Sequence, residues 1–110
     1  MKGRAVVRQY ETGKRDFSRA KLCNARLEGA HLEGIDLSWA LLRGADLSEA
    51  NLAGANLRGS DMLGADLSDA DLSGADLCGA NLFKAEVTKA QIAQAESVKL
   101  AILPDGTKHE

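Results

Sequence analysis

Apolar residues recur at every fifth position along most of the chain, and alanine precedes most of them by two places. We take each fifth-position residue as the centre of a unit. All sixteen centres are apolar: Phe17, Leu22, Leu27, Leu32, Leu37, Leu42, Leu47, Leu52, Leu57, Met62, Leu67, Leu72, Leu77, Leu82, Val87 and Ile92. Two places before the centre, the first unit has Arg15 and the later units have alanine, except for Ile35 and Ser60. No insertion breaks this register over residues 15–94.

A step of five residues fits neither a long helix nor a long strand. On an α-helix, five residues turn by about 500°, so successive leucines would advance by roughly 140° and never share one face. In a straight strand, an odd step places successive leucines on opposite faces, and frequent glycines weaken a strand further. The period instead predicts short extended segments separated by turns.

This period predicts a chain that winds around its own leucines. In each Ala-x-Leu segment, the two apolar side chains lie two positions apart and point the same way. The next two residues turn the chain, and four such turns close a square coil of twenty residues. Each centre then stacks on the centre twenty positions later, as in the column Leu37, Leu57 and Leu77, and neighbouring coils pair through their backbone groups. We predict an all-β fold, a quadrilateral parallel β-helix of about four coils over residues 15–94.

Three kinds of position in this register carry specific expectations. Leucines that meet in a narrow interior leave room for only a methyl group at the partner position, so Ile35 is expected to distort or widen its coil. Ser60 is expected to need a hydrogen-bond partner for its hydroxyl group. The Asp or Asn before most centres suits a tight turn, because short polar side chains bond to nearby backbone groups.

Two stretches carry a family resemblance: ADLSEANLAGANL at residues 45–57 and ADLSDADLSGADLCGANL at residues 65–82. They resemble the A(D/N)LXX signature of the pentapeptide repeat family, and the resemblance extends over residues 15–94. It implies a right-handed quadrilateral β-helix. Many family members are small stand-alone bacterial proteins of unknown function, and some larger members imitate DNA and act on type II topoisomerases.

Both ends of the chain depart from the repeat and are expected to cap it. Residues 1–14 form the predicted N-terminal cap, with a short amphipathic helix over residues 4–11, RAVVRQYE. Its apolar residues recur at helical spacing: Val6, Val7 and Tyr10. Residues 95–110 form a predicted C-terminal cap or tail, whose apolar residues are expected to fold over the last coil: Val98, Leu100, Ile102 and Leu103.

Charge is unevenly distributed along the chain, although the formal net charge is only -2. Residues 1–26 have eight Lys and Arg against two acids, whereas residues 27–94 have four against eleven. We therefore expect a basic end and an acidic body, an arrangement that can steer charged partners. The N-terminus has no apolar run typical of a signal peptide, and no segment approaches a membrane span, so we expect a cytoplasmic protein that does not bind a membrane.

Nothing in the pattern points to catalysis, a cofactor or a metal site. The repeat places its carboxylates on the outside of a convex rod, without a cleft that could hold a substrate or raise a pKa. His31 and His109 are isolated, which argues against a metal site. Cys23 and Cys78 are expected nearly three coils apart, beyond disulfide reach, and are expected to be reduced. We therefore predict a non-enzymatic protein without a cofactor.

One side of the predicted coil gathers apolar residues that point outward. Folding the register brings four of them into one strip: Trp39, Leu41, Leu63 and Phe83. Single apolar residues are common on protein surfaces, but a strip of this kind suits contact with a partner protein or with a second copy of the chain. We predict a scaffold for protein–protein interaction whose partner is unidentified. A homodimer stays open as one form of that interaction.

The neighbouring side stacks acidic residues at a repeat of about 5 Å. They are Asp46, Asp66 and Glu86, with Glu49 and Asp69 at the edge. Such rows resemble the negative ladder of the DNA-mimicking members, so modulation of a type II topoisomerase such as gyrase is the alternative function. Aspartate also belongs to the repeat consensus whatever the function, so a plain solvated surface is the simpler interpretation.

Direct binding of nucleic acid is a third interpretation. It is based on the basic residues near the N-terminus: Lys2, Arg4, Arg8, Lys14, Arg15, Arg19, Lys21 and Arg26. Few aromatic residues lie among them, and the acidic body would repel phosphate. The sequence therefore argues against direct nucleic-acid binding.

Overall fold

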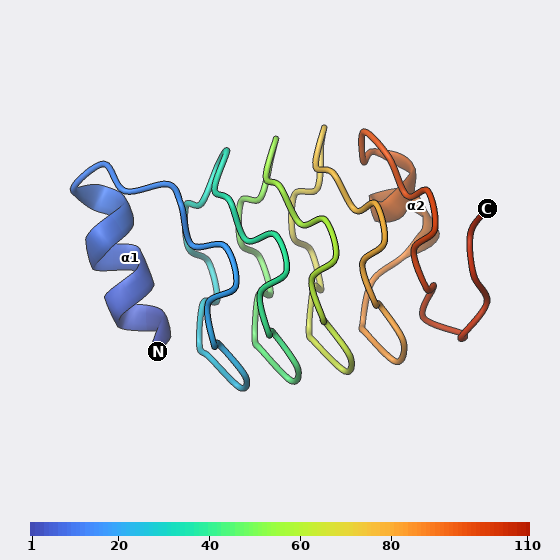
Figure 1. Ribbon diagram of the computed structural model, residues 1–110, viewed down its shortest axis with the longest axis horizontal. Helices are drawn as coiled ribbons and strands as arrows, with labels where there is room; N and C mark the ends of the chain where they lie inside the picture. The colour runs from blue at the N-terminus through green and yellow to red at the C-terminus, as the bar shows by residue number, and fades with distance from the viewer.

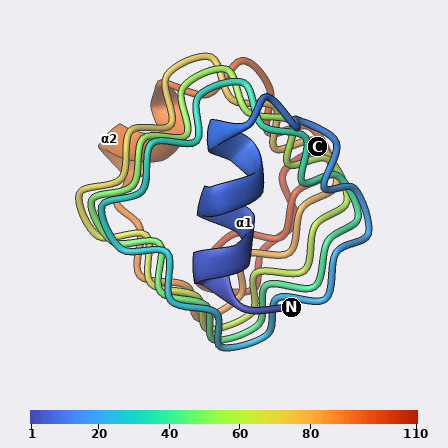
Figure 2. The ribbon, with the colours of Figure 1, turned by 90° about the vertical axis from the view of Figure 1, so that its left-hand side faces the viewer.

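The computed structural model describes residues 1–110 and shows a rod of stacked coils (Figure 1). The rod measures 37 × 23 × 23 Å. Viewed along its axis, successive coils lie over one another with their corners aligned (Figure 2). Parallel bridges join residues twenty positions apart, and one such column runs through Asp16, Asp36, Asn56 and Asp76. The predicted parallel β-helix with a period of twenty residues is confirmed.

Hydrogen bonds between neighbouring coils, rather than long strands, hold the backbone together. The N–H of Leu37 donates to the carbonyl oxygen of Asn56 in the next coil (2.8 Å), and the N–H of Asp36 donates to that of Arg15 in the previous coil (2.9 Å). Sheet pairing is limited to single bridges, because a turn interrupts every extended segment. Each coil thus satisfies its polar backbone groups with the coils on both sides.

Inward leucines and alanines form one continuous core along the rod axis. Every centre from Leu22 to Leu82 is at most 1% exposed, and each buried leucine contributes about 1.5–3 kcal/mol relative to an exposed one. Buried alanines fill most partner positions beside the centres. The hydroxyl of Ser60, the buried polar exception, donates to the carbonyl oxygen of Leu57 (2.7 Å). The expectation that Ser60 needs a partner is confirmed.

Each corner is a tight turn closed by one backbone hydrogen bond. The N–H of Ala40 donates to the carbonyl oxygen of Leu37 (3.1 Å), and φ is positive two places after the centre, at Trp39 (59°). A positive φ at this place is what a type II turn requires. Oδ1 of Asp36 accepts hydrogen bonds from the N–H (2.9 Å) and the hydroxyl (2.6 Å) of Ser38. The short polar residue before each centre therefore serves the turn.

Ile35 is fully buried and leaves the pairing of its coil with the next coil undisturbed, so the expectation of a distorted coil is wrong. The N–H of Asn56 reaches the carbonyl oxygen of Ile35 at 2.9 Å, the same distance as the equivalent bond from Asp61 to Ala40. In the previous coil, the position below Ile35 holds Arg15, whose guanidinium donates to the carbonyl oxygen of Tyr10 (2.9 Å). Because this first position lacks an inward alanine, the end of the core has space for the larger side chain of Ile35.

The helix α1, Gly3–Glu11, lies across the N-terminal end of the rod (Figure 2). Its Val6 is fully buried in the core. The hydroxyl of Tyr10 donates to the carbonyl oxygen of Glu33 (2.5 Å), and the N-terminal amino group donates to that of Lys21 (2.9 Å). These contacts fix both ends of α1 on the first coil.

At the other end, the helix α2, Lys89–Ala93, interrupts the coil. The pattern predicts a regular repeat centred on Ile92, and this prediction is wrong because residue 92 lies in α2. The hydroxyl of Thr88 accepts from the N–H of Gln91 (3.1 Å), while the side chain of Gln91 accepts from the N–H of Thr88 (2.8 Å). This reciprocal capping box stabilises the start of a helix.

After α2 the coil resumes one residue out of step. The bridges are now Asp76 with Ser97 and Asn81 with Ile102, twenty-one positions apart. Leu100 consequently occupies a corner, with φ of 64°, and its side chain is 46% exposed. The expectation that Leu100 folds over the last coil is wrong, because the inserted residue moves it to the outside. Residues 105–109 then turn back, and Lys108 pairs antiparallel with Ile102.

Candidate interaction surfaces

The outward apolar residues predicted to form a strip are unequally exposed. Trp39 is 59% exposed and Leu41 40%, whereas Leu63 and Phe83 are half-buried. Asp61 follows Leu41 in its column, and Arg43 lies one coil before Leu63 in the neighbouring column. Arg43 Nε and Asp61 Oδ2 form an ion pair (2.5 Å) between them. We call Trp39 and Leu41 together the Trp39 corner, since they are the exposed part of this strip.

The indole ring of Trp39 lies over the next coil rather than projecting freely into solvent. A Cβ atom added to Gly59 would be 2.4 Å from Cε3 and 2.5 Å from Cζ3 of Trp39. Gly59 holds the equivalent corner of that coil, twenty residues on. Because any side chain at residue 59 would collide with the ring, the ring can lie over this corner only because residue 59 is glycine. Trp39 nevertheless remains 59% exposed, so part of its surface is available for contact.

Phe83 is partly covered by the C-terminal tail. A Cβ atom added to Gly106 would be 3.2 Å from Cε1 of Phe83, so the tail backbone lies against the ring. The ammonium group of Lys84 lies 5.3 Å from the ring centroid, within range of a cation–π contact. Phe83 therefore contributes less open surface than its place in the strip suggests.

We call the stacked acids the acidic ladder: Asp46, Asp66 and Glu86, with Glu49 and Asp69 at the edge. Its column is stacked as the register predicts. Parallel bridges join Asp46 to Asp66 and Asp66 to Glu86, and the column begins with Arg26. Oδ1 of Asp46 accepts from the hydroxyl (2.6 Å) and the N–H (3.0 Å) of Ser48, and these bonds hold the pKa of Asp46 below its usual range. Asp46 and Asp66 are half-buried and serve their turns, whereas three other acids of this side are exposed: Glu86, Glu49 and Asp69.

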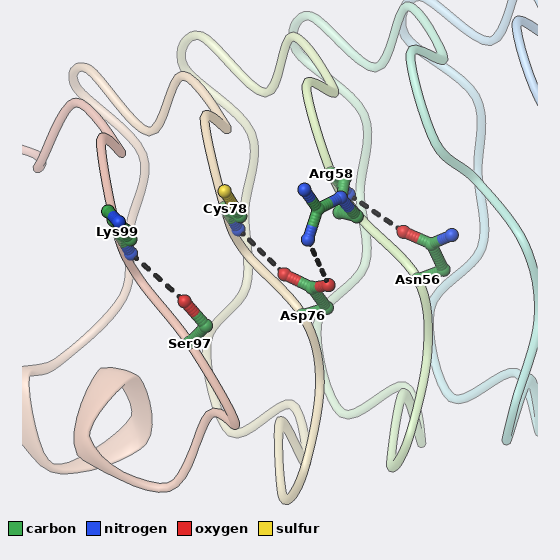
Figure 3. A network of polar contacts seen from close by, with 6 residues as sticks. All are labelled: Asn56, Arg58, Asp76, Cys78, Ser97 and Lys99. Atoms are coloured by element: carbon green, nitrogen blue, oxygen red, sulfur yellow. Dashed lines mark hydrogen bonds and ion pairs between the residues drawn. The ribbon is translucent and has the colours of Figure 1, made fainter.

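On a third side of the rod, polar residues occupy equivalent places in successive coils, as Asn56, Asp76 and Ser97 do (Figure 3). Nη1 of Arg58 lies 2.9 Å from Oδ2 of Asp76, whose Oδ1 accepts from the N–H of Cys78 (3.0 Å). Partial burial is the largest single influence and raises the pKa of Asp76, but the hydrogen bonds from Arg58 and the Cys78 N–H, together with the charge of Arg58, hold the pKa below its usual range. The guanidinium is 54% exposed, so this pair adds little stability.

No group of three or more His, Cys, Asp or Glu side chains is placed to hold a metal ion. The thiols of Cys23 and Cys78 are both free. Neither helix combines the length and the apolar character needed to cross a bilayer.

Two grooves appear that the sequence pattern did not reveal. One, of about 860 Å³, lies between α1 and the first coil and is lined by basic side chains, including those of Arg4 and Arg26. The other, of about 570 Å³, lies beside α2 and is lined by acids, including Asp69 and Glu86. The charge excess of residues 1–26 is visible in the sequence, but the placement of α1 and the presence of α2 decide where the grooves form.

Comparison with known proteins identifies the repeat. The family model described as pentapeptide repeats, in eight copies, matches residues 16–38, 35–74 and 60–95. No curated protein sequence matches the chain. Among solved structures, HetL is a pentapeptide repeat protein involved in heterocyst differentiation regulation from the cyanobacterium Nostoc sp. strain PCC 7120. It is 31% identical with a TM-score of 0.53, and the match covers 86% of this chain and 64% of HetL.

Two further structures are similar. A second pentapeptide repeat protein from Nostoc PCC 7120 is 45% identical with a TM-score of 0.44, over 93% of this chain and 75% of that one. One from the thylakoid lumen of Arabidopsis thaliana is 24% identical with a TM-score of 0.50, over 91% of this chain and 73% of that one. The plant protein supports the fold alone.

Proposed function

Because the chain belongs to the pentapeptide repeat family, we propose that it is a non-enzymatic cytoplasmic scaffold that binds a protein partner through its outward surface. Inward positions are set by packing around the leucines, whereas the outward positions are free to differ between coils. Specificity for a partner therefore lies in the outward residues. The Trp39 corner is the part of that surface best suited to contact.

The conformation of Trp39 carries this proposal. Its φ of 59° lies in the left-handed region, where a residue with a side chain costs about 1–2 kcal/mol. Glycine holds the same corner in the next two coils, at Gly59 and Gly79, whereas Arg19 holds it in the previous coil with φ of 63°. A tryptophan here is costly for the backbone and leaves more than half of its side chain exposed, so the fold gains little from it. Exposed aromatic residues held in place are typical anchors of protein interfaces.

A relative with a regulatory role is consistent with this proposal. HetL is involved in the regulation of heterocyst differentiation, and the chain spans 64% of its length. Regulation by contact with a partner suits a convex rod without a catalytic constellation. We propose a regulatory binding role of this general kind and leave the process itself open.

The proposal is tested by affinity capture from a lysate of the source organism. Wild type is compared with Trp39→Ser/Leu41→Ser, and Leu100→Ser serves as the matched control because Leu100 is the other exposed leucine and, like Trp39, holds a corner with positive φ. Recovery of a specific partner should fall at least about tenfold with the double variant alone, since loss of a hot spot costs about 2 kcal/mol or more. Equal recovery with all three proteins would rule out the Trp39 corner as the binding surface.

A DNA-mimicking modulator of a type II topoisomerase is the second proposal, favoured by the stacking of Asp46, Asp66 and Glu86. It is tested in a supercoiling assay with gyrase. The matched variant is Asp46→Asn/Asp66→Asn/Glu86→Gln, which removes three charges and keeps the turns, because Asn51 Oδ1 accepts from the N–H of Ala53 (3.0 Å) in the same way. Inhibition that disappears with this variant supports mimicry, and unchanged supercoiling at large molar excess rejects it.

A further inference from the structure

Two grooves of opposite charge lie on one side of the rod, one at each end. A single column of parallel bridges runs from one groove to the other through Arg26, Asp46, Asp66 and Glu86. Arg26 lines the groove beside α1, and Glu86 lines the groove beside α2. One lateral face is therefore basic at the N-terminal end and acidic over the rest of its length. We call it the bipolar face.

The basic end of the bipolar face carries uncompensated positive charge. Its groove has four Lys or Arg side chains and one acid, Glu28; the cations are Lys2, Arg4, Arg8 and Arg26. The Arg26 side chain is 82% exposed, and its Nε lies 3.7 Å from Glu28, too far for a hydrogen bond. The first turn of α1 has no acidic residue, so the helix dipole adds to the positive potential.

The acidic part of the bipolar face has the opposite character. No Lys or Arg lines its groove, which contains three acids: Asp69, Asp71 and Glu86. Glu49 lies one coil below Asp69, at the equivalent corner, and both are exposed. Negative charge thus continues along the face from the second coil to α2.

We propose that the bipolar face binds a second copy of the chain in antiparallel orientation. Reversing one rod against another places the basic groove of each copy on the acidic part of the other, so one contact compensates both charge excesses. A second copy fits better than an unrelated acidic protein, because the same face carries both complementary surfaces in the order that a twofold axis requires. Such an interface is isologous and closes at a dimer.

The dimer leaves the Trp39 corner free. Trp39 and Glu49 are ten residues apart, half of the twenty-residue coil, and therefore occupy opposite corners of the square. The proposed dimer is thus independent of the partner binding proposed above, and each can fail without the other. A paired rod would present two Trp39 corners on its two outer sides.

The test is the molar mass of the full chain, measured by light scattering after size-exclusion chromatography. The Debye length falls from about 30 Å at 0.01 M salt to about 3 Å at 1 M, so we expect a dimer at low salt and a monomer at high salt. Two charge reversals should each weaken the dimer at least about tenfold. They are Arg4→Glu/Arg8→Glu at the basic groove and Asp69→Lys/Glu86→Lys at the acidic part. An equimolar mixture of the two variants should restore a dimer.

The matched control is Lys99→Glu/Lys108→Glu, which changes the net charge as much as the reversal on α1 but near the C-terminus. The control should dimerise like wild type. The proposal is overturned by a monomer at low salt, by species larger than a dimer, or by a dimer that survives both reversals. It is also overturned if the control loses the dimer equally, or if Trp39→Ser/Leu41→Ser abolishes the dimer.

Discussion

Trp39 and Gly59 occupy the same corner of successive coils, and the indole ring of Trp39 fills the space that a side chain at residue 59 would need. The conformation of the exposed ring thus depends on a residue twenty positions away. Since the chain has one tryptophan, its fluorescence reports on the surroundings of Trp39 alone.

Replacing Gly59 with alanine should displace the ring. We expect Gly59→Ala to shift the Trp39 emission to longer wavelength and to destabilise the protein by more than the about 1–2 kcal/mol of a left-handed alanine. Gly54→Ala is the control, because Gly54 has nearly the same φ, 67°, but nothing within 4 Å of an added Cβ. Equal effects of the two changes on emission would show that Trp39 does not lie on Gly59.

Gly3 allows α1 to dock closely on the first coil. A Cβ atom added at Gly3 would be 2.1 Å from the carbonyl oxygen of Arg26. We therefore expect Gly3→Ala to lower the melting temperature, although alanine favours a helix over glycine by about 1 kcal/mol. The exposed Glu11 at the other end of α1 provides a control, and Glu11→Ala should melt like wild type. A higher melting temperature for Gly3→Ala would contradict the docked position of α1.

Inward and outward leucines should respond differently to truncation. Leu57 is fully buried, so Leu57→Ala should cost about 2–5 kcal/mol in the free energy of unfolding. Leu41 is 40% exposed, and Leu41→Ala should cost less than about 1 kcal/mol. Chemical denaturation of both variants checks this contrast. A similar cost for both would place Leu41 in the core.

Hydrogen bonds to aspartates should make stability depend on pH. The hydroxyl and the N–H of Ser73 donate to Oδ1 of Asp71, at 2.5 and 2.9 Å, and lower the pKa of Asp71. Because the folded pKa is the lower one, this stabilisation is present above the unfolded pKa of about 3.9 and is lost as the pH falls through the folded pKa.

Ser73→Ala should therefore raise the pKa of Asp71 towards its usual value, as followed by NMR titration of the carboxyl group. Its loss of stability relative to wild type should shrink as the pH falls below about 3.9. In an Asp71→Asn background, the same Ser73→Ala change should have no pH-dependent effect. A pH-independent difference in the original background would show that the hydroxyl does not act through the carboxylate.

The repeat could be predicted from the sequence because packing alone determines its inward positions. Leu57 and its equivalents leave space only for alanine beside them, and this produces the five-residue period. The turns follow from equally local chemistry, as Asp36 and Ser38 show. Because both causes act over a few neighbouring residues, the inward positions and the turns can be predicted directly from the local sequence.

The C-terminal region could not be predicted, because α2 and the register shift depend on competing local structures. Ala90 and Ile92 still match the repeat, yet the capping box of Thr88 and Gln91 favours a helix there. The extra residue then moves Leu100 to an exposed corner. Gly106 lies against Phe83 only because the C-terminal tail folds back. The repeat pattern contains no signal for this change of direction.

The most direct test of partner binding is collisional quenching of Trp39 fluorescence by acrylamide, with and without the captured partner. The exposed indole should be readily quenched in the free protein, and saturation with the partner should lower the quenching constant severalfold as the Trp39 corner is covered. A partner that binds fully while the quenching constant stays unchanged would contradict the proposal that this corner is the binding surface.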